Sequence, residues 1–116
     1  MSKIIDMAAR PRPYSRYALE ALQLLGEQIR LGRRARRWTQ SELAERAGIS
    51  RATLIKAENG DPRVTIGTAF ELAALAGATL FQPDRERLSM DLDRTQARSA
   101  LLPKRIVSED DDGDDF

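Results

Sequence analysis

The segment TQSELAERAGISRATLIKAENG, from Thr39 to Gly60, contains two helix-start patterns separated by a glycine. Thr39 is followed three residues later by Glu42, which has the form of a capping box at the start of a helix. Gly48 supplies the left-handed residue that ends that helix, and Ser50 is a good N-cap for another. The segment therefore predicts two short helices, over residues 40–47 and 51–58, joined by a tight turn.

Apolar and polar residues alternate in this segment as a helix pair on a bundle requires. Ala44 is small where the second helix must come close, and five further apolar residues face the bundle: Leu43, Ala47, Ile49, Leu54 and Ala57. The second helix then exposes a face that carries Arg51 and Lys56. A protruding helix of this kind has the width of the major groove of DNA.

The flanking sequence predicts further helices. Ser15 can cap a helix that runs to about Arg36, with a core-facing stripe at Ala18, Leu22, Leu25 and Ile29; Gly26 and Gly32 are tolerated inside it at a cost. A helix over residues 66–76 lies between Thr65 and Gly77. Residues 79–81 fit a short strand. Asp84 can cap a fifth helix that extends to about Ser99, although the alternation of Leu88, Met90 and Leu92 also fits a strand.

These elements predict an all-α bundle of four to five helices. We expect residues 1–13, which contain Pro11 and Pro13, to be a flexible arm, and residues 14–82 to form a helix-turn-helix domain. Residues 83–102 would be a C-terminal extension, helical in the favoured interpretation, and residues 103–116 a disordered acidic tail.

The composition excludes several classes of function. The chain of 116 residues contains no cysteine and no histidine, which removes thiolate chemistry, disulfides and the commonest general base and metal ligand. We therefore expect no catalytic residues, no metal and no cofactor; an enzyme would need a carboxylate pair in a cleft. No apolar run approaches the ~20 residues of a membrane span, and the first residues lack a secretion signal, so we expect a cytoplasmic protein.

Charge is distributed unevenly along the chain. Residues 109–116 hold six of the 18 acidic side chains, which leaves 19 basic and 12 acidic side chains in residues 1–108, a net charge of +7. Eight arginines lie between Arg10 and Arg37, against Glu20 and Glu27. This separation favours an anionic partner for the basic part, although arginines that merely keep a helical protein soluble would give the same count.

The stretch from Thr39 to Gly60 closely resembles the Xre family, the phage-repressor-like helix-turn-helix regulators, and the resemblance extends over about residues 22–80. It implies that the helix after Ser50 is the recognition helix, which enters the major groove. Base contacts would come from its exposed face, by Arg51, Ala52, Thr53 and Lys56. Backbone phosphates would be bound by residues at helix ends, namely Thr39, Gln40, Ser50 and Asn59. Each of these residues could instead be an ordinary solvated helix residue.

Three further interpretations concern residues near this motif. The resemblance implies that Arg33 and Glu58 form a buried ion pair between the first helix and the end of the recognition helix. Trp38 has a core or staple role rather than stacking on a base. The arginines at 34, 36 and 37 fit a basic edge for phosphates or a solvated face equally well.

The C-terminal part, ALLPKRI followed by EDDDGDDF after DRERLSMDLDR, resembles the ends of HipB-type antitoxins, which are Xre regulators encoded beside HipA-like kinase toxins. This resemblance implies an autoregulating repressor that also binds a HipA-like kinase. The tail residues that would contact the toxin are Asp110, Asp111, Asp112, Asp114, Asp115 and Phe116. A tail that is only solubilising, or that competes with phosphates, is the alternative.

One recognition helix contacts few base pairs, so we expect a homodimer on a palindromic operator of double-stranded DNA, with residues 79–81 and the following helix as its face. Two other functions remain open. One is a repressor without a toxin partner. The other is a protein-interaction adaptor that has lost DNA binding, which would have no need of the cations Arg51 and Lys56.

Overall fold

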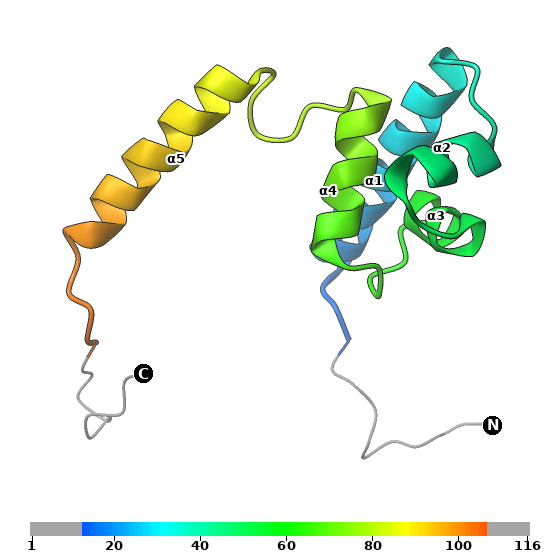
Figure 1. Cartoon of the computed structure of the whole chain (residues 1–116). Coiled ribbons are helices and arrows are strands. Elements are labelled where there is room, and N and C mark those ends of the chain that lie inside the picture. The colour runs from blue at the N-terminus through cyan, green and yellow to red at the C-terminus, as the bar shows by residue number, and fades with distance from the viewer. Residues whose placement is uncertain (1–12, 107–116) are drawn as a thin grey trace. The chain divides into compact units, whose positions relative to one another are not determined.

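The computed structural model describes residues 13–106, which form five α-helices and no strand (Figure 1). The predicted all-α helix-turn-helix fold is confirmed, and each helix lies within two residues of its expected bounds. The helices are α1 (Arg16–Ala35), α2 (Gln40–Ala47), α3 (Arg51–Glu58), α4 (Ile66–Ala76) and α5 (Arg85–Ala100).

Local hydrogen bonds explain where α2 and α3 begin and end. The hydroxyl oxygen of Thr39 accepts from the backbone N–H of Glu42 at 3.0 Å, and the Glu42 carboxylate accepts from the Thr39 N–H at 2.7 Å. Gly48 ends α2 with a φ of 71°, a left-handed conformation that suits glycine. Ser50 accepts from the Thr53 N–H at 3.0 Å and so caps α3. The helix-turn-helix geometry is therefore encoded locally.

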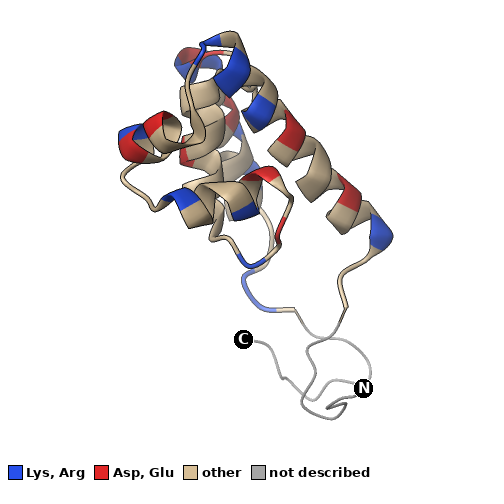
Figure 2. Ribbon diagram, turned by 90° about the vertical axis from the view of Figure 1, so that its right-hand side faces the viewer, with Lys and Arg blue, Asp and Glu red and all other residues tan. Residues whose placement is uncertain are grey.

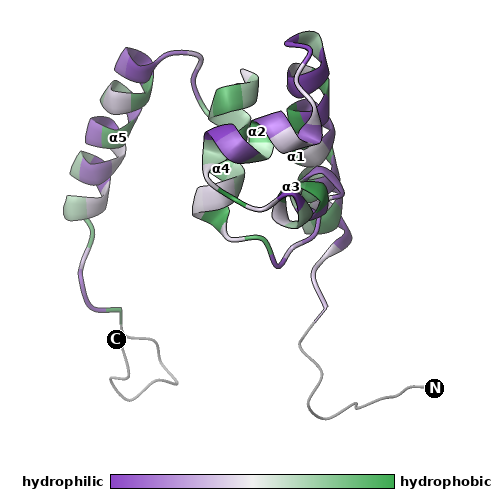
Figure 3. Cartoon of the chain, turned by 45° about the vertical axis from the view of Figure 1, so that its right-hand side comes forward, coloured by the Kyte–Doolittle hydropathy of each residue, from purple (hydrophilic) through white to green (hydrophobic). Residues whose placement is uncertain are grey.

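The core of the bundle draws one large aliphatic side chain from each of the first four helices. Ile29, Leu43, Leu54 and Leu72 have no exposed surface, and four alanines fill the space between them: Ala44, Ala57, Ala73 and Ala76. α4 is rich in hydrophobic residues (Figure 3). Small residues let the four helices approach one another closely, so α3 is held firmly on the other three.

Two glycines of α1 have a packing role that the sequence analysis missed. A Cβ atom on Gly26 would collide with the backbone carbonyl groups of Ala57 and Glu58 at the end of α3. A Cβ atom on Gly32 would collide with the backbone and the Cβ atom of Ala76 at the end of α4. These glycines are therefore the points where α1 touches the ends of two other helices, and the cost that we expected within α1 is offset by close packing.

The short strand considered at residues 79–81 is not formed. Phe81 has a φ of 69°, which is a left-handed conformation and interrupts an extended backbone. Chain contacts divide the molecule at this point, between Leu80 and Phe81. The strand interpretation of residues 88–92 is also wrong, because they lie in the middle of α5.

The second unit is described by itself. Its helix α5 is capped by Asp84, which accepts from the N–H of Arg87 at 2.8 Å, and it has no buried residue. Both signs of charge occur along it, as they do on the helices of the bundle (Figure 2). No helix of residues 13–106 has the length and apolar character that crossing a membrane requires. The expected flexible arm and the acidic tail fall largely outside the described residues, so the domain division stays a prediction.

Candidate nucleic-acid interface

The helix α3 has one face in the bundle and one in solvent. Leu54, Ala57 and Glu58 are buried, and at about 100° per residue Ala52 lies diametrically opposite to them. Arg51 and Lys56 are exposed on the two flanks of Ala52. The outermost surface of α3 therefore consists of a small apolar residue with a cation on either side.

A basic cleft of about 540 Å³ lies on the Arg51 side of α3. It combines three arginines of α1 with the beginning of α2 and with Arg51. Its lining residues are Arg30, Arg33, Arg34, Thr39, Gln40, Ser41 and Arg51. Arg33 is buried and bonded within the protein, but the guanidinium groups of Arg30, Arg34 and Arg51 beside a helix N-terminus suit a phosphate group, because both the cations and the free N–H groups of the helix attract anions.

A second concave surface, of about 390 Å³, lies on the other side of α3. It is formed by α3, by the loop after it and by the beginning of α4. Its lining residues are Ile49, Ser50, Thr53, Lys56, Arg63, Val64, Thr65 and Thr68. Lys56 gives this surface a positive charge, Arg63 forms an ion pair with Asp61 at 2.8 Å, and four hydroxyl groups can bind oxygen atoms. The exposed edge of α3 thus stands between two cationic hollows.

The residues expected to contact bases come together on α3 as one continuous patch. Arg51, Ala52 and Lys56 are exposed and Thr53 is half-buried. Ile55, which the sequence analysis did not consider, is half-buried next to them. The patch offers cations for guanine and small apolar groups for a thymine methyl.

The expected phosphate contacts divide into capping residues and network residues. The hydroxyl groups of Thr39 and Ser50 are already engaged in the caps of α2 and α3, where each accepts a backbone N–H. The Ser50 hydroxyl also donates to the Thr53 hydroxyl at 2.9 Å. Asn59 accepts from Arg30 Nη2 at 3.1 Å through Oδ1. These side chains therefore have internal partners in the free protein.

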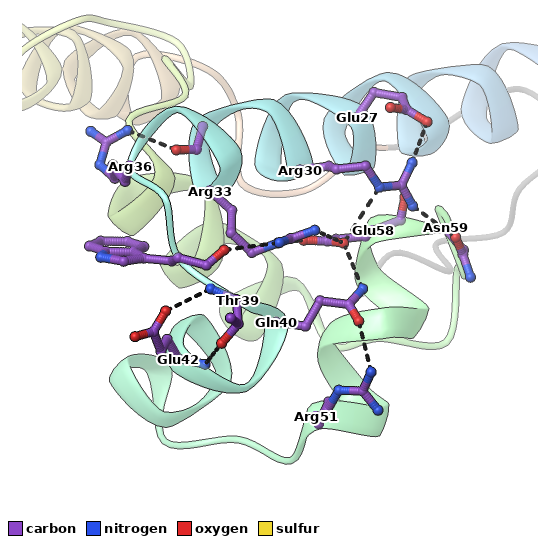
Figure 4. Close-up of polar contacts among 12 residues, drawn as sticks. Glu27, Arg30, Arg33, Arg36, Thr39, Gln40, Glu42, Arg51, Glu58 and Asn59 are labelled. Atoms are coloured by element: carbon purple, nitrogen blue, oxygen red, sulfur yellow. Dashed lines mark hydrogen bonds and ion pairs between the residues drawn. The ribbon is translucent and has the colours of Figure 1, made fainter.

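A buried ion pair joins α1 to the end of α3 (Figure 4). Arg33 Nε donates to Glu58 Oε2 at 2.7 Å and its Nη2 donates to Oε1 at 3.2 Å, and the Glu58 side chain has no exposed surface. Arg30 Nε lies 3.5 Å from Glu58 Oε1. Arg33 also donates to the carbonyl of Trp38 at 3.0 Å. The Arg33–Glu58 pair thereby ties together α1, α3 and the segment before α2.

The pKa of Glu58 reflects two opposing effects. Burial alone would raise the pKa of this carboxyl group, since it disfavours the charged form. The hydrogen bonds from Arg33 and Gln40, with the positive charges of Arg33 and Arg30, outweigh burial, so the pKa of Glu58 lies below its ordinary value of 4.5. The carboxylate is therefore charged at neutral pH and part of the interface electrostatics.

Gln40 connects this ion pair to α3. Its Nε2 donates to Glu58 Oε1 at 3.2 Å, and its Oε1 accepts from Arg51 Nη2 at 3.2 Å (Figure 4). From the sequence alone, only a phosphate contact is expected of Gln40. The first bond joins residues that are 18 positions apart in the sequence, and the second joins residues that are 11 positions apart. No local pattern could therefore have indicated them.

Trp38 and Arg36 make contacts within the protein that stabilise the fold. The indole ring is half-buried against the core, and the guanidinium carbons of Arg46 and Arg36 lie over it at 4.2 and 5.8 Å from the ring centroid. Arg36 Nη1 donates to the backbone carbonyl of Ala76 at 2.7 Å, at the end of α4. Of the three arginines with an open interpretation, Arg36 thus caps a helix and Arg34 lines the basic cleft.

Three residues of the interface are not among those predicted from the sequence: Arg30, Ser41 and Arg63. Arg30 could have been found from the helical period, because it lies one turn before Arg33 on the same face of α1. Ser41 and Arg63 depend on how α2 and the loop after α3 fold back, which the sequence does not indicate. No cluster of acidic side chains that could hold a metal ion occurs among residues 13–106. The acidic tail residues Asp110–Phe116 lie outside the described residues.

Comparison with known proteins finds similarity over the bundle. Residues 29–81 match the helix-turn-helix family. No curated protein matches the chain significantly. A chain of a HipA–HipB–O2–O3 complex shares 29% sequence identity, covers 65% of this chain and 97% of its own, and has a TM-score of 0.47. An MDT protein gives the same values. A chain of a HipB–O2 20mer complex shares 28% identity over 66% of this chain and 97% of its own, with a TM-score of 0.47.

Proposed function

We propose that this protein is a sequence-specific repressor of the Xre type that binds operator DNA through α3, since residues 29–81 match the helix-turn-helix family. The observation that carries the proposal is the exposed edge of α3 between two cationic hollows. A helix seated in the major groove has a phosphate backbone on each side, so cations on both sides of α3 match that arrangement.

Each part of the interface then has a separate task. Arg51 and Lys56 donate to guanine O6 and N7, and Ala52 with the Thr53 methyl contacts thymine methyl groups. The basic cleft binds one phosphate backbone through Arg30, Arg34 and the start of α2. The second hollow binds the other backbone through Arg63 and Lys56. Phosphate contacts fix the position of α3, and base contacts supply the sequence preference.

We propose further that the repressor works as a homodimer on a palindromic operator, with α5 as the face between the two copies. α5 has no buried residue, and Leu88 and Leu92, one turn apart, are 42% and 55% exposed. Leucines on one face of a helix with this much exposure favour contact with another protein surface. Two copies would place two α3 helices about 34–36 Å apart, one helical turn of DNA.

The acidic C-terminal segment supports a second partner. Residues 109–116 combine six acidic side chains with a terminal Phe116, and the sequence resembles the end of HipB-type antitoxins. We propose that this segment binds a HipA-like kinase toxin and that the protein represses the operon encoding both. Acidic side chains would pair with arginines of the kinase, and the phenyl ring would fill a pocket.

The DNA-binding proposal is tested with DNA from upstream of the gene for this protein. Lys56→Ala should weaken binding to this DNA by about 1–3 kcal/mol and relax the base preference at one position. Lys104→Ala, which removes the same charge from the second unit, is the matched control. Affinity measured by fluorescence anisotropy should fall with salt, with a log–log slope of about −0.9 per phosphate neutralised. Equal affinity of the Lys56 and Lys104 variants, or no dependence on salt, would contradict the proposal.

The antitoxin proposal is tested with the product of a neighbouring kinase-like gene. Deletion of residues 109–116 should leave operator binding intact and weaken binding of the kinase in a pull-down with the purified proteins. Kinase binding that survives the deletion would move that contact to the folded domain. A genome with no such gene beside this one would leave the repressor without the proposed partner.

A further inference from the structure

Gln40 has its two amide ends bound to chemically opposite partners. Its NH₂ group faces the carboxylate of Glu58, with 3.2 Å between Nε2 and Oε1. Its oxygen faces the guanidinium of Arg51, with 3.2 Å between Oε1 and Nη2. A charged carboxylate can only accept hydrogen bonds, and a guanidinium can only donate them. The two partners therefore permit only one orientation of the Gln40 amide, with its oxygen toward α3.

The Glu58 carboxylate is itself held rigidly. Two nitrogens of Arg33 donate to the two oxygens of Glu58 at 2.7 and 3.2 Å, and the side chain of Glu58 is completely buried. Bidentate arginine–carboxylate pairs fix both position and direction. Arg33 is also nearly buried and bonds the Trp38 carbonyl. The carboxylate thus provides a fixed reference point from which the side chain of Gln40 is oriented.

We propose that Glu58 acts through Gln40 as a positioning residue for Arg51, so that the buried ion pair of α1 and α3 sets the direction of a base-reading guanidinium. The proposal rests on the function proposed above, in which Arg51 reads a base. It adds a specificity role to Glu58 and Gln40, in addition to stability and to phosphate binding. Figure 4 shows the continuous line of contacts from Arg33 through Glu58 and Gln40 to Arg51.

The physical benefit of this arrangement is preorganisation. An exposed arginine has many rotamers, and it loses that freedom when it binds a base. If Gln40 restricts Arg51 before DNA arrives, less freedom remains to be lost for the matching base pair. One hydrogen of the Gln40 NH₂ group points to Glu58, and the other is left for a phosphate oxygen. A single amide can then link phosphate binding to base reading.

The test compares Gln40→Met with Gln28→Met, a substitution of an exposed glutamine on α1. Methionine keeps the length of the side chain and removes both hydrogen bonds. The readout is the ratio of dissociation constants for the operator and for operators with single base-pair changes. Gln40→Met should reduce discrimination about two- to tenfold at the base pair that Arg51 reads, and less at other positions. In an Arg51→Ala background, Gln40→Met should reduce it no further.

The outcomes separate the inference from the proposed function. If Arg51→Ala leaves discrimination unchanged at every position, Arg51 does not read a base, and both proposals about it fail. If Arg51→Ala abolishes discrimination at one position while Gln40→Met preserves it, Arg51 reads that base without help, and only the positioning inference is overturned. A uniform loss of affinity at all positions in Gln40→Met would reduce Gln40 to a phosphate contact.

The role of Glu58 is tested in the free protein by NMR, through rotation of the Arg51 guanidinium about its Nε–Cζ bond. This rotation should be slow in the wild type and in Gln28→Met, and faster in Gln40→Met and in Glu58→Gln. If Glu58→Gln does not fold, hydrogen exchange of the Gln40 side-chain amide in the wild type tests whether Gln40 is bound to Glu58. Slow exchange of one amide proton supports its bond to the buried carboxylate. Fast exchange of both protons, or free rotation of Arg51 in the wild type, overturns the inference.

Discussion

Glu58 is charged, has no exposed side-chain surface and is bound by two arginines. A buried ion pair of this kind contributes little net stability compared with apolar residues, but removal of one partner leaves an uncompensated charge. Arg33→Met should therefore lower the free energy of unfolding by about 3–5 kcal/mol in urea denaturation. Arg34→Met, at the exposed neighbouring position, should lower it by less than about 0.5 kcal/mol. Similar losses in both variants would mean that Arg30 alone compensates Glu58.

The lowered pKa of Glu58 also predicts a dependence of stability on pH. A carboxyl group whose pKa is lower in the folded state stabilises the fold above its unfolded pKa of 4.5, and this contribution is lost as the pH falls through the folded value. The difference in unfolding free energy between the wild type and Glu58→Gln should therefore shrink as the pH is lowered below 4.5. Asp61, whose pKa is lowered from 3.8 to about 2 because Arg63 binds it, loses its contribution as the pH falls through about 2. A difference that stays constant with pH would contradict the lowered pKa of Glu58.

At the scale of helices, most boundaries could be predicted because their causes are local. The capping box of Thr39 and Glu42, the left-handed Gly48 and the Ser50 cap all involve residues within three or four positions of one another. The contacts between helices could not be predicted in the same way. The roles of Gly26 and Gly32 depend on which backbone segments pack against α1. The sequence of α1 alone does not indicate those segments.

The glycine contacts of α1 can be tested against a glycine without them. Gly32→Ala places a methyl group against the backbone of Ala76, so it should lower the free energy of unfolding by about 1–3 kcal/mol. Gly67 lies in α4 with no atom within 4 Å of an added Cβ, and Gly67→Ala should raise it by about 0.5–1 kcal/mol, since alanine favours a helix. Thermal or urea denaturation of the two variants measures the sign of each change in the free energy of unfolding. Stabilisation by Gly32→Ala would show that α1 and α4 can separate freely at this point.

At the scale of the whole molecule, the chain consists of a bundle with a complete core and a second unit without one. The fully buried aliphatic residues all belong to α1–α4, whereas α5 buries nothing among the described residues. The sequence predicted the helix α5 correctly from its cap at Asp84, but it left a strand as an alternative, because leucines at 88 and 92 fit both periods. A helix with exposed leucines and no core of its own gains stability from packing against a further surface.

That surface is, in our proposal, a second copy of the chain, and substitutions on α5 test it in the full-length protein. Leu88 and Leu92 lie on one face of α5, while Met90, about 200° from Leu88, lies on the opposite face. Replacement of both leucines by serine should convert the dimer to a monomer in sedimentation velocity, and Met90→Ser should leave it intact. Circular dichroism should show an unchanged α1–α4 bundle. A monomer has one α3 for two half-sites, so the double variant should bind the palindrome at least about tenfold more weakly but bind a single half-site as before. A double variant that remains dimeric would place the contact between copies elsewhere on the molecule, with α5 left for another partner.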